Sequence, residues 1–154
     1  MSDAAVSRLL LFRVGTLVCA ADLGVVREIL PRLETTRIPG AMPFVAGLVN
    51  VRGQLVTVVE GWRALGLEAP AAAPDGAEGV VGTTILINVG EGGRVLGLAV
   101  DEVVDLLVVE AGALEPRESL AGVDPVLVRA VGRREGKAFV VLDTDAVLAP
   151  VLTS

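Results

Sequence analysis

The apolar residues of this chain fall into short clusters separated by glycine and polar residues. Valine is the most frequent residue, with 28 copies, and β-branched side chains pack well on the pleated surface of a sheet. The clusters lack the long 3.6-residue repeat of an amphipathic helix, so they predict many short strands rather than a helical bundle. We expect strands at residues 9–14, 17–21, 45–51, 54–59, 83–89, 94–100, 102–109, 126–131 and 138–142.

Short helices are expected in three of the connections between these strands. An aspartate that can cap a helix N-terminus stands before two of them, and proline or glycine follows all three. The expected helices are residues 23–29 between Asp22 and Pro31, residues 62–65 before Gly66, and residues 144–148 between Asp143 and Pro150. The fold is therefore predicted to be mainly β, with a few short helices.

Two segments between the predicted elements are rich in glycine and proline. Residues 38–44 contain two prolines and one glycine, and we expect a structured loop there. Residues 68–82 are rich in alanine, proline and glycine, and we expect a flexible surface loop. The length of 154 residues corresponds to about one domain. Strands with such regular spacing predict a sandwich or a barrel, formed by residues 1–154 as a single unit.

The composition narrows the class of protein. Hydrophobic residues make up 53% of the chain and charged residues 21%, which provides enough apolar material for a core. The formal net charge of −6 argues against binding to nucleic acid, whose phosphates attract basic proteins. The longest uncharged stretch, residues 38–51, contains two prolines and is shorter than the roughly 20 residues of a membrane-spanning helix. With no secretory signal pattern visible, we expect an intracellular protein without direct membrane insertion.

Few residues of the chain suit catalysis. Histidine is absent, which removes the most common general base and metal ligand. The single cysteine, Cys19, excludes an internal disulfide and a cysteine-based zinc site. It is either a small buried residue or a reactive thiol. Gly90, Gly92 and Gly93 lie between two predicted strands, where a hairpin turn is favoured over a cofactor-binding loop. We therefore expect no cofactor, no catalytic residue and no enzymatic activity.

Two groups of acidic residues leave alternatives open. Asp143 and Asp145 suit either a divalent cation or the N-terminus of a helix. Asp101, Glu102 and Asp105 suit either a proton-transfer pair or the solvated end of a strand. The second interpretation is the simpler one in both cases, because carboxylates are common at helix starts and exposed strand ends. We therefore expect no metal site.

Arg52 stands out because it lies between two strongly apolar runs and is followed by Gly53. A charge in this place must reach water or find a partner, since burying it unpaired costs free energy. Arg52 is either an ordinary exposed charge in a hairpin turn or part of a binding site. Glu28 and Glu60 are isolated in the sequence, and their surroundings alone indicate only surface charges.

The segment VAGLVNVRGQLVTVV at residues 45–59 resembles the centre of the CheW-like domain, in which an N-x-R-G motif precedes an apolar strand. Further segments resemble parts of the same family and occur in the order that the family shows. They are VREIL at residues 26–30, RIP at 37–39, PFV at 43–45, GLAVDEV at 97–103 and FVVLD at 139–143. The resemblance covers about residues 9–149, which is nearly the whole chain.

The resemblance implies two five-stranded SH3-like β-barrels packed side by side, in agreement with the number of predicted strands. It also implies a non-enzymatic adaptor in chemotaxis-like signal transduction. The implied partners are the regulatory domain of a CheA-type histidine kinase and the cytoplasmic hairpin tip of a chemoreceptor. The implied location is the cytoplasm, at membrane-associated receptor arrays. A groove between the two barrels is the candidate binding site for the receptor.

The resemblance further implies roles for particular residues. Glu28 and Arg52 match charged positions of the receptor-facing surface, where they would recognise a receptor helix through ion pairs or hydrogen bonds. Val26 and Val100 would form the apolar floor beside them. Gly47 matches a small position near the kinase-facing side, where a side chain would intrude. In such a helix-in-groove contact, the charges mainly set specificity and the apolar floor supplies most of the affinity.

Some positions depart from the family pattern. Thr57 stands where the family has a proline, and Glu60 and Gly61 replace a common Asp-Leu pair before the unusual Trp62. These departures favour a divergent relative, so a CheW-like regulator in a non-chemotaxis pathway is one alternative function. A small-molecule-binding β-barrel and a self-assembling structural subunit are two others.

Overall fold

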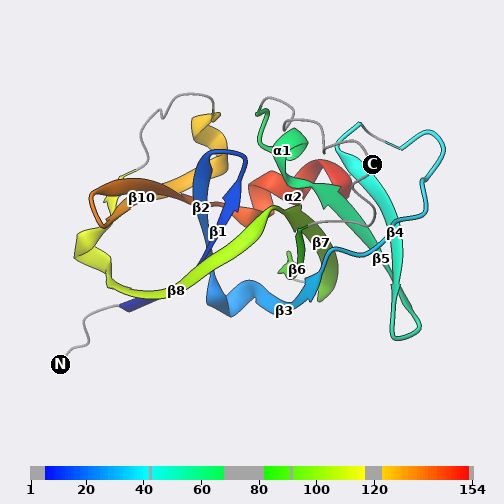
Figure 1. The fold of residues 1–154 in the computed structure, drawn as a ribbon, viewed down its shortest axis with the longest axis horizontal. Helices are drawn as coiled ribbons and strands as arrows, with labels where there is room; N and C mark the ends of the chain where they lie inside the picture. The colour runs from blue at the N-terminus through cyan, green and yellow to red at the C-terminus, as the bar shows by residue number, and fades with distance from the viewer. Residues whose placement is uncertain (1–5, 42, 68–81, 91, 117–122, 153–154) are drawn as a thin grey trace, which may run out of the picture.

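The computed structural model describes residues 6–41, 43–67, 82–90, 92–116 and 123–152 (Figure 1). Within these residues the chain forms two β-sheets that lie side by side, with a helix between them. The prediction of a mainly β fold with a few short helices is therefore confirmed. The predicted flexible loop at residues 68–82 lies outside the described residues, apart from Gly82.

The first sheet contains strands from both ends of the chain. Its members are β1 (Val6–Val14), β2 (Leu17–Asp22), β8 (Glu102–Glu110), β9 (Glu115–Pro116), β10 (Val128–Arg134) and β11 (Lys137–Leu142). Their order in space is β8-β1-β2-β11-β10-β9. Neighbours are antiparallel except for the parallel pair of β2 and β11. The two-residue strand β9 adds a sixth member to a sheet for which five strands were predicted.

The second sheet is built from the middle of the chain. Its members are β3 (Val26–Pro31), β4 (Val45–Val51), β5 (Gln54–Glu60), β6 (Thr83–Val89) and β7 (Arg94–Val100). Their order in space is β3-β6-β7-β5-β4, with a parallel pair of β5 and β7. The chain thus crosses between the sheets twice, once after β2 and once after β7. The strands of the second sheet are therefore inserted, along the chain, between strands of the first sheet; the two sheets with their connections are called the first and second halves of the molecule.

Side-chain alternation along the strands divides the core into three clusters. One face of the first sheet holds a small cluster of its own, which includes Leu9 and Leu11. One face of the second sheet holds another, which includes Val56 and Val58. The remaining faces share the largest cluster with helix α2 (Thr144–Leu152), which buries Val147, Leu148 and Val151 between the sheets. Because this cluster takes residues from both sheets, it joins the two halves into one body.

The predicted helix at residues 23–29 is wrong. Asp22 does cap a helical turn, since its Oδ1 accepts a hydrogen bond from the N of Gly24 at 2.9 Å, but that turn is a single 3-10 turn at Leu23–Val25. The chain then becomes strand β3, which pairs with β6. Valine and isoleucine favour this extended form. Pro31 ends an edge strand, where its missing N–H costs no ladder hydrogen bond.

The other two predicted helices are present with shifted ends. Helix α1 (Gly61–Ala64) begins one residue earlier than predicted. Helix α2 continues past residue 148 and contains Pro150, so the expectation that this proline ends the helix is wrong. The last turn buries Val151 against the shared core cluster, and this packing stabilises the helix beyond the proline.

A hydrogen-bonded junction fixes the second crossing between the sheets. Asp101 lies between β7 and β8, and its Oδ2 accepts hydrogen bonds from the N of Gly15 at 2.6 Å and from Nη1 of Arg13 at 3.3 Å. The Nε of Arg13 lies 3.5 Å from Oε1 of Glu102. These contacts tie the β1–β2 turn to the end of β7. Asp101 and Glu102 are therefore partners of Arg13, and Asp105 pairs separately with Arg134 at 2.9 Å.

Candidate functional site

The turn between β4 and β5 places Arg52 at the tip of an exposed hairpin. Val51 pairs with Gln54, so Arg52 and Gly53 form a two-residue turn, with φ values of 49° and 85°. Two positive φ values are typical of the type I′ turn, which matches the twist of the flanking strands. The Oδ1 of Asn50 accepts a hydrogen bond from the N of Gly53 at 2.7 Å. The N-x-R-G motif thus encodes this turn, because asparagine holds it and glycine adopts the positive φ.

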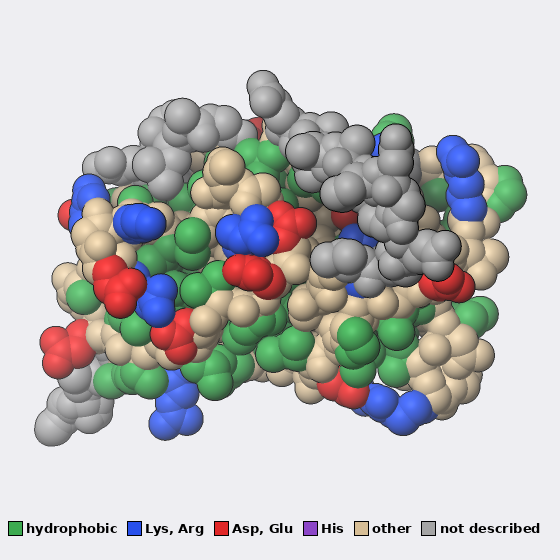
Figure 2. All heavy atoms as spheres, in the orientation of Figure 1, with side chains coloured by type: hydrophobic (Ala, Val, Ile, Leu, Met, Phe, Trp, Pro, Cys, Tyr) green, Lys and Arg blue, Asp and Glu red, His purple; other side chains and the backbone are tan. Residues whose placement is uncertain are grey.

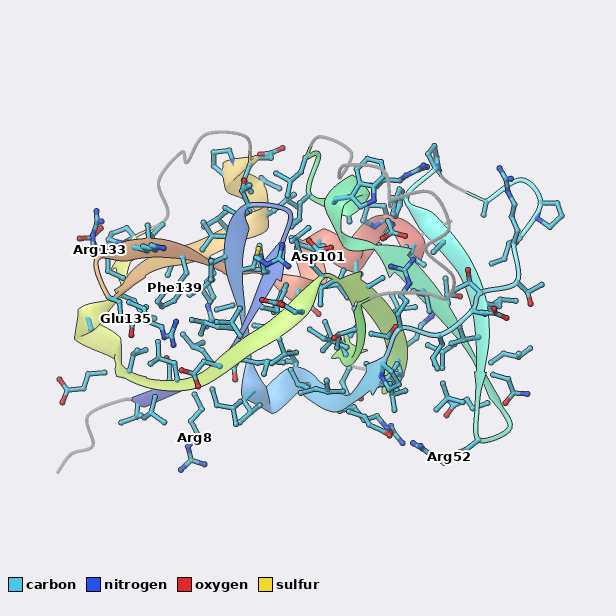
Figure 3. The ribbon with its side chains drawn as sticks, in the orientation of Figure 1. Arg8, Arg52, Asp101, Arg133, Glu135 and Phe139 are labelled. Carbon is cyan, nitrogen blue, oxygen red and sulfur yellow. The ribbon has the colours of Figure 1, made fainter. Side chains whose placement is uncertain are left out.

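Arg52 reaches from this hairpin to Glu28 on β3 (Figure 3). The contact is bidentate, with Nη1 donating to Oε2 at 3.0 Å and Nη2 donating to Oε1. Strands β3 and β4 are the two edges of the second sheet, so the pair bridges the open seam of the curled sheet. The hydrogen bond from Arg52 lowers the pKa of Glu28 below its usual value, and the same bond raises the pKa of Arg52.

Val26 and Val100, the two residues expected in the apolar floor, differ from each other in burial. Val26 begins β3 and is half-buried against the shared core cluster. Val100 ends β7 and is only 4% exposed within that cluster, so it supports the surface from below rather than lining it. Ile29 on the same edge strand as Glu28 is 43% exposed, although the sequence reasoning assigned it to a helix. The alternation of more buried and more exposed residues along an edge strand was the signal that could have identified Ile29 as exposed.

Gly47 is buried, and the backbone of a neighbouring loop packs directly against it. Its φ is +149°, and an added Cβ would lie 2.4 Å from the carbonyl oxygen of Thr36. Thr36 and Leu48 exchange two backbone hydrogen bonds of 2.8 Å, which hold the loop before β4 against that strand. Glycine is required here because the loop backbone packs directly on its α-carbon.

A cavity of about 840 Å³ opens beside this loop. Its lining includes Arg32, Arg37, Glu60, Trp62 and Arg63. Arg32 donates to both carboxylate oxygens of Glu60, at 2.7 and 3.2 Å, and both side chains are sheltered. Arg63 donates to the carbonyl oxygen of Pro43 at 2.8 Å. Its guanidinium carbon also lies over the Trp62 ring, 4.8 Å from the ring centroid. The sequence reasoning treated Glu60 as a surface charge and missed all three arginines of this cavity.

The cavity borders the region of Gly47, because Val45 and Ala46 of β4 belong to its lining. Neither Arg37 nor Arg63 forms an ion pair with another described residue, whereas Arg32 is neutralised by Glu60. Within the described residues, two of the arginines that line the cavity therefore lack an acidic partner, on a chain whose net charge is −6. Such a region attracts carboxylates or other anions.

The remaining candidate residues serve the fold. Oδ1 of Asp143 accepts from the N of Ala146 at 3.1 Å at the start of α2, and Oδ1 of Asp145 accepts from the N of Gly90 at 3.2 Å. The described residues hold no group of three His, Cys, Asp or Glu side chains that could bind a metal ion. Cys19 is fully buried, and burial raises the pKa of its thiol to about 12. It packs as a small apolar residue, and the reactive-thiol interpretation is wrong.

No helix of the described part of the chain has the length and apolar character that crossing a membrane requires. Glu28, Ile29 and Arg52 lie on exposed edges or turns, and Arg37, Trp62 and Arg63 line the cavity. They provide ion pairs and apolar contact area, which are the means of recognising a partner.

Comparison with known proteins agrees with this architecture. Residues 8–151 match the CheW-like domain family. The chemotaxis protein CheW of Rhizobium meliloti (strain 1021) is 31% identical over 140 residues, which cover 90% of this chain and 85% of that protein. The crystal structure of the scaffolding protein TtCheW from Thermoanaerobacter tengcongensis superimposes with a TM-score of 0.79 at 19% identity, over 94% of this chain and 93% of that one. The expected pair of SH3-like barrels is thereby confirmed, and the chain belongs to the CheW-like domain family.

Proposed function

We propose that this chain is a non-enzymatic adaptor that couples chemoreceptors to a CheA-type histidine kinase in chemotaxis-like signal transduction. It acts as a single docking unit in the cytoplasm, at membrane-associated receptor arrays. One side, with Glu28 and Arg52 above Val26 and Val100, binds the cytoplasmic hairpin tip of a receptor. The other side, near Gly47, binds the regulatory domain of the kinase.

The observation that carries this proposal is family membership over nearly the whole chain, together with the exposed Arg52–Glu28 pair. The R. meliloti relative bears the name of a chemotaxis protein. An exposed ion pair adds little to stability, so its bidentate geometry at a hairpin tip is better explained by recognition. Arg52 keeps 68% of its side chain exposed while paired, which leaves donors for a partner.

The cavity beside Gly47 supports the kinase-facing part of the proposal. Arg37 and Arg63, which form no ion pair with another described residue, favour an acidic segment on the kinase domain. Trp62 offers a rigid aromatic surface at the same place, and tryptophan and arginine are the residue types that most often dominate binding energy. Gly47 influences this side indirectly, because it holds the loop that carries Arg37.

Binding assays with the two partners test the proposal. The purified chain should bind a soluble fragment of a chemoreceptor hairpin from the same organism, and separately the regulatory domain of a CheA-type kinase. Reversing both charges with Glu28→Arg and Arg52→Glu retains an intramolecular pair but inverts the charges that a receptor meets. We expect this double variant to lose receptor binding roughly tenfold and to keep kinase binding.

A matched reversal at an exposed cation away from this edge, Lys137→Glu at the start of β11, serves as the control and should leave receptor binding unchanged. If the double reversal binds the receptor fragment as well as the unmodified chain does, Glu28 and Arg52 do not contact the receptor. If the unmodified chain binds neither partner, the adaptor function itself is wrong.

A further inference from the structure

The loop between β3 and β4 forms one wall of the 840 Å³ cavity, and hydrogen bonds hold it at three points. Thr36 and Leu48 exchange two backbone hydrogen bonds. Residues 38–41 form a turn closed by a 3.2 Å hydrogen bond, in which a proline followed by a glycine with a φ of 77° is typical of type II. At the end of the loop, the N of Glu60 donates to the carbonyl oxygen of Phe44 at 2.7 Å. This wall is therefore formed before any ligand arrives.

Two arginines of the cavity keep hydrogen-bond donors for a ligand. Arg37 directly follows the anchored Thr36. The guanidinium of Arg63 is held on two sides, by the carbonyl oxygen of Pro43 and by the ring of Trp62. A guanidinium has five N–H donors in a planar fork that suits carboxylate and phosphate oxygens. Arg63 spends one of them on Pro43, and neither arginine forms an ion pair with another described residue.

The acidic groups around the cavity leave this capacity in place. Glu60 is the one acidic residue in the described lining, and both of its carboxylate oxygens accept from Arg32. Glu34, on the same loop as Arg37, is exposed and does not belong to the lining. The buried Nε of Arg32 has no hydrogen-bond partner among the described residues. A buried donor without a partner calls for a water molecule or a ligand nearby.

The rest of the lining is apolar and favours an organic ligand over a bare inorganic ion. Ile38, Pro39, Pro43, Val45 and Trp62 belong to it. Figure 2 shows basic and apolar side chains together at the right-hand end of the molecule, where Figure 1 draws the loop before β4. The volume lies within the range of small-molecule sites, which combine apolar walls with a few polar groups. A monovalent carboxylate also suffers less repulsion from the glutamate in the lining than a divalent phosphate does.

This wall contains the residues in which the chain departs from the CheW-like pattern. Glu60 and Gly61 stand in place of the common Asp-Leu pair, and Trp62 is unusual. An added Cβ at Gly61 would lie 2.6 Å from the carbonyl oxygen of Ala99, so a leucine does not fit this backbone. Glutamate is one methylene longer than aspartate and spans the distance to Arg32. The cavity is therefore a feature of this chain and not of the family pattern.

We propose that the cavity binds a small organic carboxylate with an apolar body. Arg37 and Arg63 balance its charge, and its apolar part lies against Trp62 and the prolines of the loop. This site goes beyond the adaptor function and does not depend on it. Because the kinase-facing part of the proposed function uses the same two arginines, a bound carboxylate would compete with the kinase domain for them.

The fluorescence of Trp62 tests the proposal, because the chain has a single tryptophan and no tyrosine. Cyclohexanecarboxylate, which has the required charge and an apolar ring, should change this fluorescence in a saturable way. Cyclohexanecarboxamide has nearly the same shape without the charge and should bind at least tenfold more weakly. Inorganic phosphate has the charge without the apolar body and should also bind at least tenfold more weakly.

Substitutions locate the site within the cavity. Arg37→Gln and Arg63→Gln should each raise the Kd of cyclohexanecarboxylate roughly fivefold. Arg94→Gln is the matched control, because Arg94 at the start of β7 is exposed, lies outside the lining and forms no ion pair with another described residue. Its Kd should equal that of the unmodified chain.

Four results would overturn the inference. The absence of a saturable change shows that the cavity holds no such ligand, and equal binding of the amide shows that the charge is not recognised. Equal binding of phosphate shows that the apolar walls contribute nothing. Unchanged affinity in both cavity variants places the ligand elsewhere. A chain that binds cyclohexanecarboxylate as expected, but binds neither the kinase domain nor the receptor fragment, would refute the adaptor function and support this inference.

Discussion

Two arginine–glutamate pairs in the second half of the molecule have the same chemistry and different surroundings. Both are bidentate, and both join residues more than twenty positions apart. In the Arg52–Glu28 pair the side chains are 68% and 30% exposed, whereas in the Arg32–Glu60 pair they are 18% and 20% exposed. The exposed pair is available to a partner, while the sheltered pair holds a loop against the end of β5.

This difference shows that the contribution of an arginine–glutamate pair to stability depends on how exposed its side chains are to water. Water competes with the exposed pair, so breaking it changes stability little. Removal of one partner from the sheltered pair leaves a partly desolvated charge without compensation. Arg32 is particularly sensitive, because its buried Nε has no hydrogen-bond partner among the described residues. We therefore expect stability effects around the sheltered pair and binding effects around the exposed one.

The largest effect is expected from Gly47→Ala, which disturbs the loop that carries the cavity. The new Cβ would lie 2.4 Å from the backbone oxygen of Thr36, at a φ that L-residues rarely adopt. We expect a loss of about 3 kcal/mol in the free energy of unfolding, measured by urea denaturation. Gly92→Ala is the matched control, because its Cβ meets nothing within 4 Å. Equal stability of the two variants would show that the packing of the Thr36 loop on Gly47 does not contribute to stability.

Glu60→Gln is expected to cost about 2 kcal/mol in the free energy of unfolding, since it leaves the sheltered Arg32 without its counter-charge. Replacing both partners, with Arg32→Met and Glu60→Leu, should recover much of the loss because no unpaired charge remains. The corresponding Glu28→Gln variant should unfold at nearly the same urea concentration as the unmodified chain. If Glu28→Gln and Glu60→Gln lose equal stability, the contrast between the pairs is wrong.

Arg37→Glu should leave stability unchanged and weaken binding of the kinase regulatory domain roughly fivefold, because it reverses a cavity charge that has no ion-pair partner among the described residues. The chain contains a single tryptophan, Trp62, so incorporation of 5-fluorotryptophan yields one fluorine resonance in the cavity wall. That resonance should shift when the unlabelled kinase domain is added. A shift with the receptor fragment alone would instead place the receptor at the cavity.

Much of the fold was predictable from local sequence. Valine clusters indicated the strands, and Arg52 and Gly53 between two apolar runs indicated the turn. The helix expected at residues 23–29 failed because a short apolar segment fits either periodicity. Pairing with β6, which local sequence does not reveal, selected the strand. The register of one strand against another is decided by tertiary packing.

The candidate site was predictable only where a local motif or a family resemblance marked it. Glu28 and Arg52 were named from the resemblance, but Arg32 and Glu60 lie 28 residues apart and no local pattern links them. The resemblance assigned Val100 to the apolar floor of the receptor site, and the structure shows it 4% exposed in the core. The valines of β8 indicated a strand, yet their exposure depends on which face the second half of the molecule covers. Burial and long-range pairing are properties of the assembled chain.

The smallest expected effect is the pH dependence of the exposed pair. The hydrogen bond from Arg52 lowers the pKa of Glu28 below the ordinary value of 4.5 in the folded chain. Folding therefore favours the ionised carboxylate, and the contribution to stability is present above pH 4.5 and is lost as the pH falls through the lowered pKa. Urea midpoints of the unmodified chain should exceed those of Glu28→Gln slightly above pH 4.5 and should converge with them at lower pH. Arg52→Gln removes the cause of the shift and should follow the Glu28→Gln curve. A constant difference between the unmodified chain and Glu28→Gln across this range would mean that the pair does not depend on the charge of Glu28, and its proposed role in recognising a receptor by charge would lose its basis.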